Sequence, residues 1–376
     1  MKITIITSPF GCIPPDAIGA IEKRWYNTSK IFVEKGHTVN FISKKPNKIV
    51  DDKIVEEGIN INFQKGYDWK KSQISNLILD FIYSFKALFL MPKTDVLILN
   101  TFFSPILSRF FRHKFKKTVY NVARFPKGQF KYYQNIDRLS CVSYAVYNEL
   151  IKQTPSVLKQ AKTIPNPVDV SSFNFHELQE NKEFTIMYTG RVHPEKGLDI
   201  LASAYKELVQ ENSNITIKLI IVGATTIAKG GGGDEYLKII NEAAGQENKI
   251  IYIDPIYNPI ELSNKMLEAD VYCYPSIAEK GETFGVAPLE AMALGLPVVV
   301  SNLDCFKDFV NDGENAIIFD HRNDAIHNLK IKLQEILNNF ELRKKLGKNA
   351  SITAKSFSTE KIASLYLSDF KKLLNA

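Results

Sequence analysis

Residues 282–300 read Glu-Thr-Phe-Gly-Val-Ala-Pro-Leu-Glu-Ala-Met-Ala-Leu-Gly-Leu-Pro-Val-Val-Val. Pro288 suits the first turn of a helix, and Gly295 suits the left-handed residue that ends one. The β-branched run that begins at Pro297 is typical of a buried strand. A loop, a helix and a strand in this order form part of a β–α–β repeat, so these residues predict a parallel sheet covered by helices.

The alternation of strand-like and helix-like segments continues in both directions. In the second half of the chain, we expect strands at 184–188, 216–222, 249–253, 271–274 and 297–300. In the first half, we expect them at 3–7, 38–42, 95–99, 118–122 and 138–142, with a helix at 20–34 that ends at Gly36. The sequence therefore predicts an α/β protein of two doubly wound, Rossmann-like domains that face a central cleft.

The chain length and a proline-broken connector place the domain boundary. A chain of 376 residues fits two domains of roughly 150–200 residues each. The connector reads Ile164-Pro165-Asn166-Pro167-Val168-Asp169. We expect the first domain at residues 1–165, completed by a C-terminal helix at about 357–376, and the second at 166–356.

Charge is distributed unevenly between the two halves. Residues 1–165 hold 26 Lys and Arg against 12 Asp and Glu, a net charge of +14, whereas the remainder holds 22 against 29, a net charge of −7. The basic half predicts a polyanionic partner, which is a phosphorylated acceptor, an anionic membrane surface or nucleic acid. The acidic second half argues against nucleic acid.

Two basic and aromatic segments, at 109–117 and 124–133, lie within this half. Such segments bind anionic lipid surfaces or stack on single-stranded nucleic acid. The alternative is a solvated helix face with ordinary core phenylalanines. Because the whole region is basic, an anionic membrane surface or a lipid-linked acceptor is the favoured partner.

Cysteine usage and hydropathy bear on the compartment. Four scattered cysteines (Cys12, Cys141, Cys273 and Cys305) indicate reduced, buried thiols in a cytoplasmic protein. The apolar run at the N-terminus is too short for a signal-peptide core. Residues 74–91 are apolar but carry Asp80 and Lys86, so we expect a packed helix and not a membrane span. The predicted location is the cytoplasm, with the inner face of the cell membrane as a peripheral site.

The first candidate site lies at residues 188–198, which read Tyr-Thr-Gly-Arg-Val-His-Pro-Glu-Lys-Gly-Leu. A strand ends at Gly190 and a helix begins after Gly197, so Arg191 and Lys196 lie in a loop at the carboxyl edge of the sheet. Two cations there can neutralise a diphosphate. The alternative is a solvated loop with surface charges. The glycine run at 230–233 follows another strand and is either a ligand-contacting loop or a mobile turn.

The second candidate site is the helix N-terminus at residues 283–287. Backbone N–H groups there form an anion and hydroxyl site. Glu282 precedes the loop and Glu290 is expected in the first turn, where each carboxylate can accept two hydroxyls of a sugar diol. The alternative for Glu290 is a favourable contact with the helix dipole.

Several motifs are missing from the sequence. It has no G-x-G-x-x-G after the first strand, no P-loop, no HExxH, no G-x-S-x-G and no Asp-x-Asp pair. The sequence therefore lacks the motifs by which a dehydrogenase, a P-loop NTPase, a zinc protease or an α/β-hydrolase is usually identified. We expect no metal and no cofactor.

Over roughly residues 160–355, these motifs resemble the donor-binding half of retaining glycosyltransferases of the family 4 type, which have the GT-B fold. The resemblance implies retaining transfer of a hexosyl unit from a nucleotide-sugar to a glycan or lipid-linked acceptor, in bacterial surface glycan synthesis. It assigns the diphosphate to Arg191 and Lys196, the transferred sugar to Glu282, and the ribose hydroxyls to Glu290. Residues 252–254 would frame the base. The implied donor-binding set is Gly19, Gly190, Arg191, Lys196, Ile253, Glu282, Thr283, Phe284, Gly285, Val286 and Glu290, with Arg191, Lys196 and Glu282 as catalytic residues.

The first half departs from the family pattern in two places. Gly19 and Ala20 stand where members carry two adjacent glycines, and residues 121–129 lack the histidine that members often have. Arg124, Lys127 and Asn121 are the acceptor-side candidates. No protein base is strictly required, because the leaving diphosphate can take the acceptor proton. A non-catalytic nucleotide-sugar binder and a nucleotide-sugar epimerase of the same fold are the alternatives.

Overall fold

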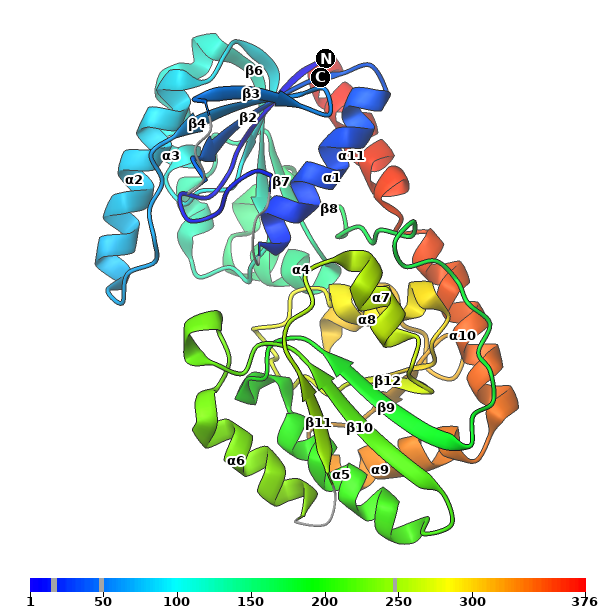
Figure 1. The fold of residues 1–376 in the computed structure, drawn as a ribbon. Helices are drawn as coiled ribbons and strands as arrows, with labels where there is room; N and C mark the ends of the chain where they lie inside the picture. Colours follow the sequence, from blue (N-terminus) through cyan, green and yellow to red (C-terminus); the bar gives the residue numbers. More distant parts are fainter. Residues whose placement is uncertain (15–18, 47–50, 246–248) are drawn as a thin grey trace. The chain divides into compact units, whose positions relative to one another are not determined.

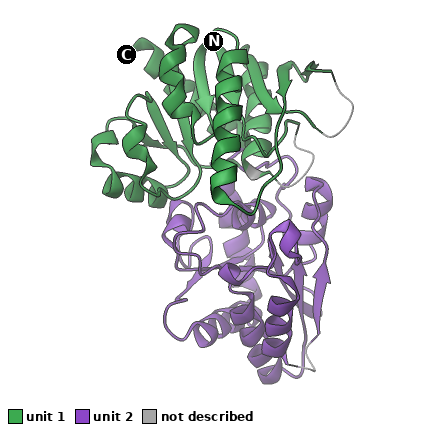
Figure 2. Ribbon diagram, turned by 90° about the vertical axis from the view of Figure 1, so that its left-hand side faces the viewer, with its two compact units in different colours: residues 1–167, 359–376 green, residues 168–358 purple. Residues whose placement is uncertain are grey.

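The computed structural model describes residues 1–14, 19–46, 51–245 and 249–376. They form two compact units, residues 1–167 with 359–376 and residues 168–358 (Figure 2). The chain passes between units two residues after each of the predicted boundaries, 165 and 356.

The first unit is built on an eight-stranded sheet in the order β3-β4-β2-β1-β5-β6-β7-β8 (Figure 1). All neighbours pair in parallel except β3 and β4. The strands are β1 (Lys2–Ile6), β2 (Thr38–Lys44), β3 (Lys53–Glu56), β4 (Ile59–Gln64), β5 (Thr94–Leu99), β6 (Phe115–Val122), β7 (Arg138–Cys141) and β8 (Ala161–Thr163). Its helices are α1 (Ala20–Glu34), α2 (Gln73–Leu90), α3 (Ser104–Leu107), α4 (Tyr144–Gln153) and α11 (Thr359–Asn375).

The second unit has a six-stranded, fully parallel sheet in the order β11-β10-β9-β12-β13-β14. The strands are β9 (Glu183–Thr189), β10 (Thr216–Val222), β11 (Ile250–Ile253), β12 (Val271–Tyr274), β13 (Val298–Ser301) and β14 (Ile317–Phe319). The helices are α5 (Leu198–Glu211), α6 (Gly233–Ala244), α7 (Pro259–Met266), α8 (Val286–Leu294), α9 (Ala325–Leu337) and α10 (Phe340–Lys355). Both units are doubly wound, as the sequence predicts.

All ten predicted strands are present, and four further strands escaped prediction: β3, β4, β8 and β14. β3 and β4 form an antiparallel hairpin in which β4 alternates Ile and Asn, unlike the apolar runs of the parallel strands. β8 and β14 have three residues each, too few to show a hydrophobic period.

The C-terminal helix α11 packs on α1 in the first unit (Figure 1). The rings of Trp25 and Tyr366 lie 5.0 Å apart. Asp369 is buried and accepts from Arg138 Nε at 2.9 Å and from Lys162 Nζ at 2.8 Å. This helix, far from the rest of its unit in sequence, therefore supplies part of that unit's core and a buried ion cluster.

The expectation of a packed helix at residues 74–91 is only half right. α2 buries one stripe, made of Asp80, Tyr83, Ser84, Ala87 and Leu88. Its opposite stripe is apolar and exposed. Among the described residues, α2 is the one helix whose length and composition would allow it to cross a membrane.

The four cysteines are buried and form no disulfide, in agreement with the prediction of buried thiols. Burial raises the pKa of the Cys141 and Cys273 thiols. Both side chains therefore stay protonated and behave as small apolar residues.

Candidate active site

The candidate loops of the second unit all leave the carboxyl ends of parallel strands. Residues 190–197 follow β9, residues 223–232 follow β10, residues 254–258 follow β11 and residues 275–285 follow β12. Because β10, β9 and β12 are adjacent and β11 flanks β10, these loops share one edge of the sheet. Open α/β sheets bind their ligands at this edge.

Gly197 allows the loops after β9 and β12 to touch. It has φ +64°, and a Cβ atom there would lie 2.4 Å from the carbonyl oxygen of Pro275. The contact is reinforced by the backbone carbonyl of Glu195, which accepts from Ile277 N at 3.0 Å and from Ser276 Oγ at 3.2 Å. A side chain at position 197 would push these two loops apart.

This contact brings together Lys196 and Glu282, which the sequence assigned to phosphate and sugar separately. Lys196 Nζ lies 2.6 Å from Glu282 Oε2, and Tyr274 donates to the same oxygen at 2.9 Å. The ammonium also lies 5.4 Å from the centre of the Tyr274 ring. Burial, followed by the charge of Glu282, raises the pKa of the Tyr274 hydroxyl. Tyr274 therefore remains a donor, and the carboxylate is held in one orientation.

Arg191 points to a different partner. Its guanidinium binds Glu195 Oε1 at 2.6 Å and donates to the carbonyl oxygen of Gly230 at 3.1 Å. The glycine run is therefore tied to the site loop. Gly232 N adds a bond to Val192 O at 2.7 Å. Whether residues 230–233 contact a ligand or form a mobile turn stays open.

The loop before α8 is anchored by a buried aromatic ring. The Phe284 ring is fully buried, 5.2 Å from the Phe309 ring, so only its backbone can reach a ligand. Gly285 has φ +90° and precedes the first turn of α8, whose N–H groups lack helical partners. Thr283 and Val286 are half-buried beside it. Glu279, earlier in the loop, binds His321 Nε2 at 3.0 Å and Arg322 at 2.9 Å.

Three further donor candidates lie on α8 or at the ends of strands. Glu290 is the fifth residue of α8, so its predicted place in the first turn is wrong: the helix begins at Val286, two residues before Pro288. Ile253 is the last residue of β11, and its carbonyl accepts from Gly223 N at 2.9 Å. Gly190 follows β9 directly, so these residues share the edge described above.

The remaining candidates lie in the first unit. Gly19 caps the N-terminus of α1; residues 15–18, directly before it, lie outside the described residues. Arg124 and Lys127 are exposed after β6. Asn121 is buried and donates to Asn100 Oδ1 at 3.2 Å; its role on the acceptor side stays a prediction.

Sequence reasoning missed Tyr274, Glu195 and Glu22. Tyr274 ends a strand and looked like a core residue, and Glu195 was part of the motif without a role. Glu22 lies in the first turn of α1 and is buried against Gly19. Burial raises its pKa, opposed in part by the charges of Arg24 and Arg124. A carboxyl group beside Gly19 and Arg124 was detectable only from their proximity in space.

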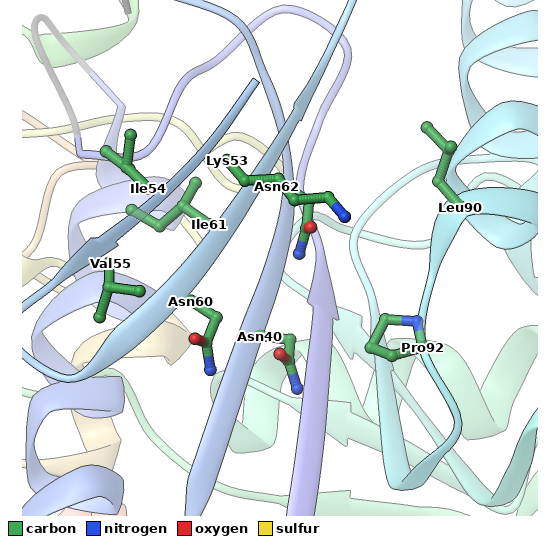
Figure 3. A pocket seen from close by; sticks show the side chains of 9 residues that line it. All are labelled: Asn40, Lys53, Ile54, Val55, Asn60, Ile61, Asn62, Leu90 and Pro92. Atoms are coloured by element: carbon green, nitrogen blue, oxygen red, sulfur yellow. The ribbon is translucent and has the colours of Figure 1, made fainter. Parts of the chain in front are cut away.

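A hollow of about 460 Å³ lies elsewhere in the first unit (Figure 3). The side chains of Asn40, Asn60 and Asn62 line it from the early residues of β2 and β4, with Leu90 and Pro92 on another side. Its lining residues stop short of the carboxyl ends of both strands, where such sheets bind ligands. Within the described residues, no group of three His, Cys, Asp or Glu side chains is arranged to hold a metal ion.

The sequence of most of the second unit matches a known protein family. Residues 170–353 match the family described as Glycosyl transferases group 1. A D-inositol 3-phosphate glycosyltransferase from Paenarthrobacter aurescens is 25% identical over 67% of this chain and 61% of its own length. A phosphatidyl-myo-inositol mannosyltransferase from Mycolicibacterium smegmatis is 33% identical over 43% of this chain and 39% of its own length. The chain thus spans less than two thirds of these relatives.

Solved structures resemble the whole chain. Sucrose-phosphate synthase from Thermosynechococcus elongatus has a TM-score of 0.78 and 18% identity, covering 100% of this chain and 99% of its own. Anabaena HepE in complex with UDP and glucose has a TM-score of 0.72 and 17% identity, covering 99% of each chain. These similarities establish the GT-B fold that the sequence resemblance implied.

Proposed function

Residues 170–353 match the glycosyl transferases group 1 family, and on that basis we propose that this chain belongs to the family and transfers a hexosyl unit from a nucleotide-sugar to a glycan or lipid-linked acceptor. We further propose that the anomeric configuration is retained and that the transfer serves a bacterial surface glycan. One similar protein is named a capsular polysaccharide biosynthesis glycosyltransferase, from Staphylococcus aureus, with 27% identity over 46% of this chain and 42% of its own.

The observation that carries the proposal is the pairing of Lys196 with Glu282 at the carboxyl edge of the second sheet. Lys196 has three N–H donors, of which Glu282 takes one, so the ammonium can also bind a diphosphate oxygen. Glu282 accepts at Oε2 from both Lys196 and Tyr274. Its carboxylate is thereby oriented, which is what a group that binds sugar hydroxyls requires.

The proposed reaction breaks the bond between C1 of the sugar and the diphosphate oxygen and forms a bond from C1 to the acceptor oxygen. The acceptor proton passes to the departing diphosphate. Negative charge grows on the diphosphate as the bond breaks, so Arg191, Lys196 and the N-terminus of α8 stabilise the transition state more than the bound donor. This scheme uses no metal and no cofactor beyond the donor.

In the same proposal, Gly190, Thr283, Phe284, Gly285 and Val286 bind the donor through their backbone. Glu290 takes the ribose hydroxyls and Ile253 lies against the base. Gly19, in the first unit, would contact a phosphate. Arg124 and Lys127 are the exposed candidates for the acceptor, and the neighbouring Glu22 joins them because it lies beside Gly19.

The test is calorimetric binding of UDP, GDP, dTDP and ADP to the wild-type protein and two variants. We expect one nucleotide to bind, with the affinity at least tenfold weaker in Lys196→Ala. Lys238→Ala is the matched control, because this lysine lies on α6 and its side chain is 77% exposed. Its affinity should equal the wild-type value. Folded protein that binds none of the four nucleotides would contradict the proposal.

A non-catalytic nucleotide-sugar binder is the second candidate. The departures of the first half from the family pattern favour it, because Gly19 and Ala20 replace two adjacent glycines and residues 121–129 lack a histidine. Release of the free sugar or its transfer, measured with the nucleotide-sugar whose nucleotide binds, distinguishes the two: a binder retains the donor unchanged. An epimerase would instead convert the donor to an isomer.

A further inference from the structure

Helix α2 carries a continuous apolar stripe on its exposed side. Its members recur every three or four residues, which places them on one face of the helix. They are between 37% and 71% exposed: Ile74, Leu77, Ile78, Phe81, Ile82, Phe85, Phe89 and Leu90. With 1.5 Å per residue, the stripe is about 25 Å long. Scattered apolar residues are ordinary on a protein surface, but a row of eight marks an interaction surface.

On this helix, the positive charge is exposed and the negative charge is buried. Its single acidic residue, Asp80, faces inward and accepts from the backbone N–H groups of Phe102 and Phe103 at 3.1 and 2.9 Å. Its single cation, Lys86, is exposed. The outward face of α2 therefore has no negative charge.

The segment beside the stripe is basic. The 3₁₀ segment η1 (Ser108–Lys114) packs on α2: the Phe85 and Phe111 rings lie 5.9 Å apart, and Lys114 Nζ donates to the carbonyl oxygen of Phe89 at 2.5 Å. Arg109 and Arg112 are exposed on this segment, and Phe110 is 64% exposed. Residues 109–114 of the basic and aromatic segment expected from sequence thus adjoin the apolar stripe, whereas residues 115–117 belong to β6.

From this arrangement we propose that α2 docks flat on a lipid bilayer with anionic headgroups, its exposed stripe within the interface and the cations of η1 at the headgroups. An apolar helix face bordered by cations and free of exposed acid suits that environment. The helix lies in the plane of the membrane and does not cross it, because its other stripe is packed in the unit. Tyr83, for example, is buried and donates to the carbonyl oxygen of Ile42 at 3.3 Å.

A second copy of this chain is a poorer occupant. A two-fold contact along the stripe sets each surface against itself. Lys86 and Arg109 of one copy would then meet the same cations of the other, without exposed acid on α2 to neutralise them. The bilayer satisfies both the apolar stripe and the cations.

The test is flotation with vesicles of phosphatidylcholine containing about 30% phosphatidylglycerol, compared with vesicles of phosphatidylcholine alone. We expect the protein to float with the anionic vesicles at low salt and much less with the neutral ones, because the cations contribute electrostatically. Ile74→Asp/Ile78→Asp should reduce the bound fraction at least tenfold. The matched control is Ile331→Asp/Ile352→Asp, on α9 and α10 of the second unit, where the residues are 44% and 58% exposed; it should float like the wild type.

A second variant, Lys86→Gln/Lys93→Gln/Arg109→Gln, keeps the stripe and removes three exposed cations. It should lose the preference for anionic vesicles, and circular dichroism should show an unchanged fold. The proposal is overturned if the wild type stays unbound at low salt, or if both isoleucine variants float equally. A dimer in sedimentation that Ile74→Asp/Ile78→Asp dissociates, without vesicle binding, would assign the stripe to a second copy. Vesicle binding needs neither donor nor acceptor, so its failure leaves the proposed transfer untouched.

Discussion

In the second unit, the loops after β9 and β12 hold Arg191, Glu195, Lys196 and Glu282 in charged contacts, whereas in the first unit the ends of β5 and β6 are joined by neutral groups. There, Asn100 Oδ1 accepts from Trp25 Nε1 at 2.9 Å and from Asn121 Nδ2 at 3.2 Å. Both units have the same doubly wound plan. The comparison teaches that the fold prepares the carboxyl edge of a sheet for ligands and that the loop residues decide which chemistry occurs there.

The two parts of the chain also differ in their net charge and in their exposed apolar surface. Residues 1–165 carry a net charge of +14 and the exposed stripe of α2, and the remainder carries a net charge of −7. The first unit is therefore the one for which an anionic acceptor is proposed, and the second holds Arg191 and Lys196 in the loop where the donor diphosphate is proposed to bind. Four substitutions can break or sharpen this division.

The largest effect on stability is expected in the first unit, from Asp369→Asn. The substitution leaves Arg138 and Lys162 without their buried carboxylate, and loss of one partner of a buried pair costs about 3–5 kcal/mol. We expect the lower end, since Lys162 is partly exposed. Calorimetry should show a lower melting temperature. Asp52→Asn, which removes an exposed partner of Lys45, should leave the melting temperature unchanged. Equal losses would mean that the buried cluster does not stabilise the unit.

Lys196→Ala should reduce transfer per folded molecule by about 10–150-fold, which corresponds to a charge-assisted hydrogen bond of about 1.5–3 kcal/mol. The variant also leaves Glu282 with Tyr274 alone, so some stability should be lost. Lys196→Ala/Glu282→Gln should recover that stability and stay inactive. If the double variant recovers transfer as well, the pair is structural, and Lys196 and Glu282 do not take part in the reaction.

Gly197→Ala should cost about 1–2 kcal/mol from the left-handed backbone and should also weaken nucleotide binding, because its Cβ would press on Pro275 and separate the two loops. Gly313→Ala separates these effects. Gly313 has φ +71° but no atom within 4 Å of a Cβ, so it should lose stability alone. Binding titrations on both variants test the contact; equal affinities would show that the loop contact does not shape the site.

The smallest effect is expected from Tyr274→Phe. It removes one hydrogen bond to Glu282, worth about 0.5–1.5 kcal/mol, and keeps the ring over Lys196. Transfer should fall by about 2–10-fold, and stability should fall by no more than the value of this one hydrogen bond. Tyr252→Phe is the control, since its hydroxyl binds Asn241 on α6. A larger loss of transfer in Tyr252→Phe than in Tyr274→Phe would mean that the hydroxyl on β11 matters more than the one at the end of β12.

Local residue patterns predicted much of the fold. The apolar runs of the parallel strands, the helix from Ala20 to Glu34 and the turn at Gly295 are encoded within a few neighbouring residues, and the structure has them at these places. β3, β4, β8 and β14 escaped because they are short or alternate with asparagine. The start of α8 at Val286, and with it the place of Glu290, escaped because a proline is tolerated throughout a helix's first turn and does not mark its first residue.

The sequence by itself determined the two-domain α/β plan, the cation-bearing loop after β9 and the division of charge between the halves, because each depends on composition or on residues close together in the chain. Only the tertiary structure decided that Lys196 meets Glu282, 86 positions away, that Asn121 faces inward, and that residues 109–114 border the exposed stripe of α2. Those contacts depend on which strands are neighbours and which helix faces are covered. Both are set by packing across the whole unit and not by any local pattern.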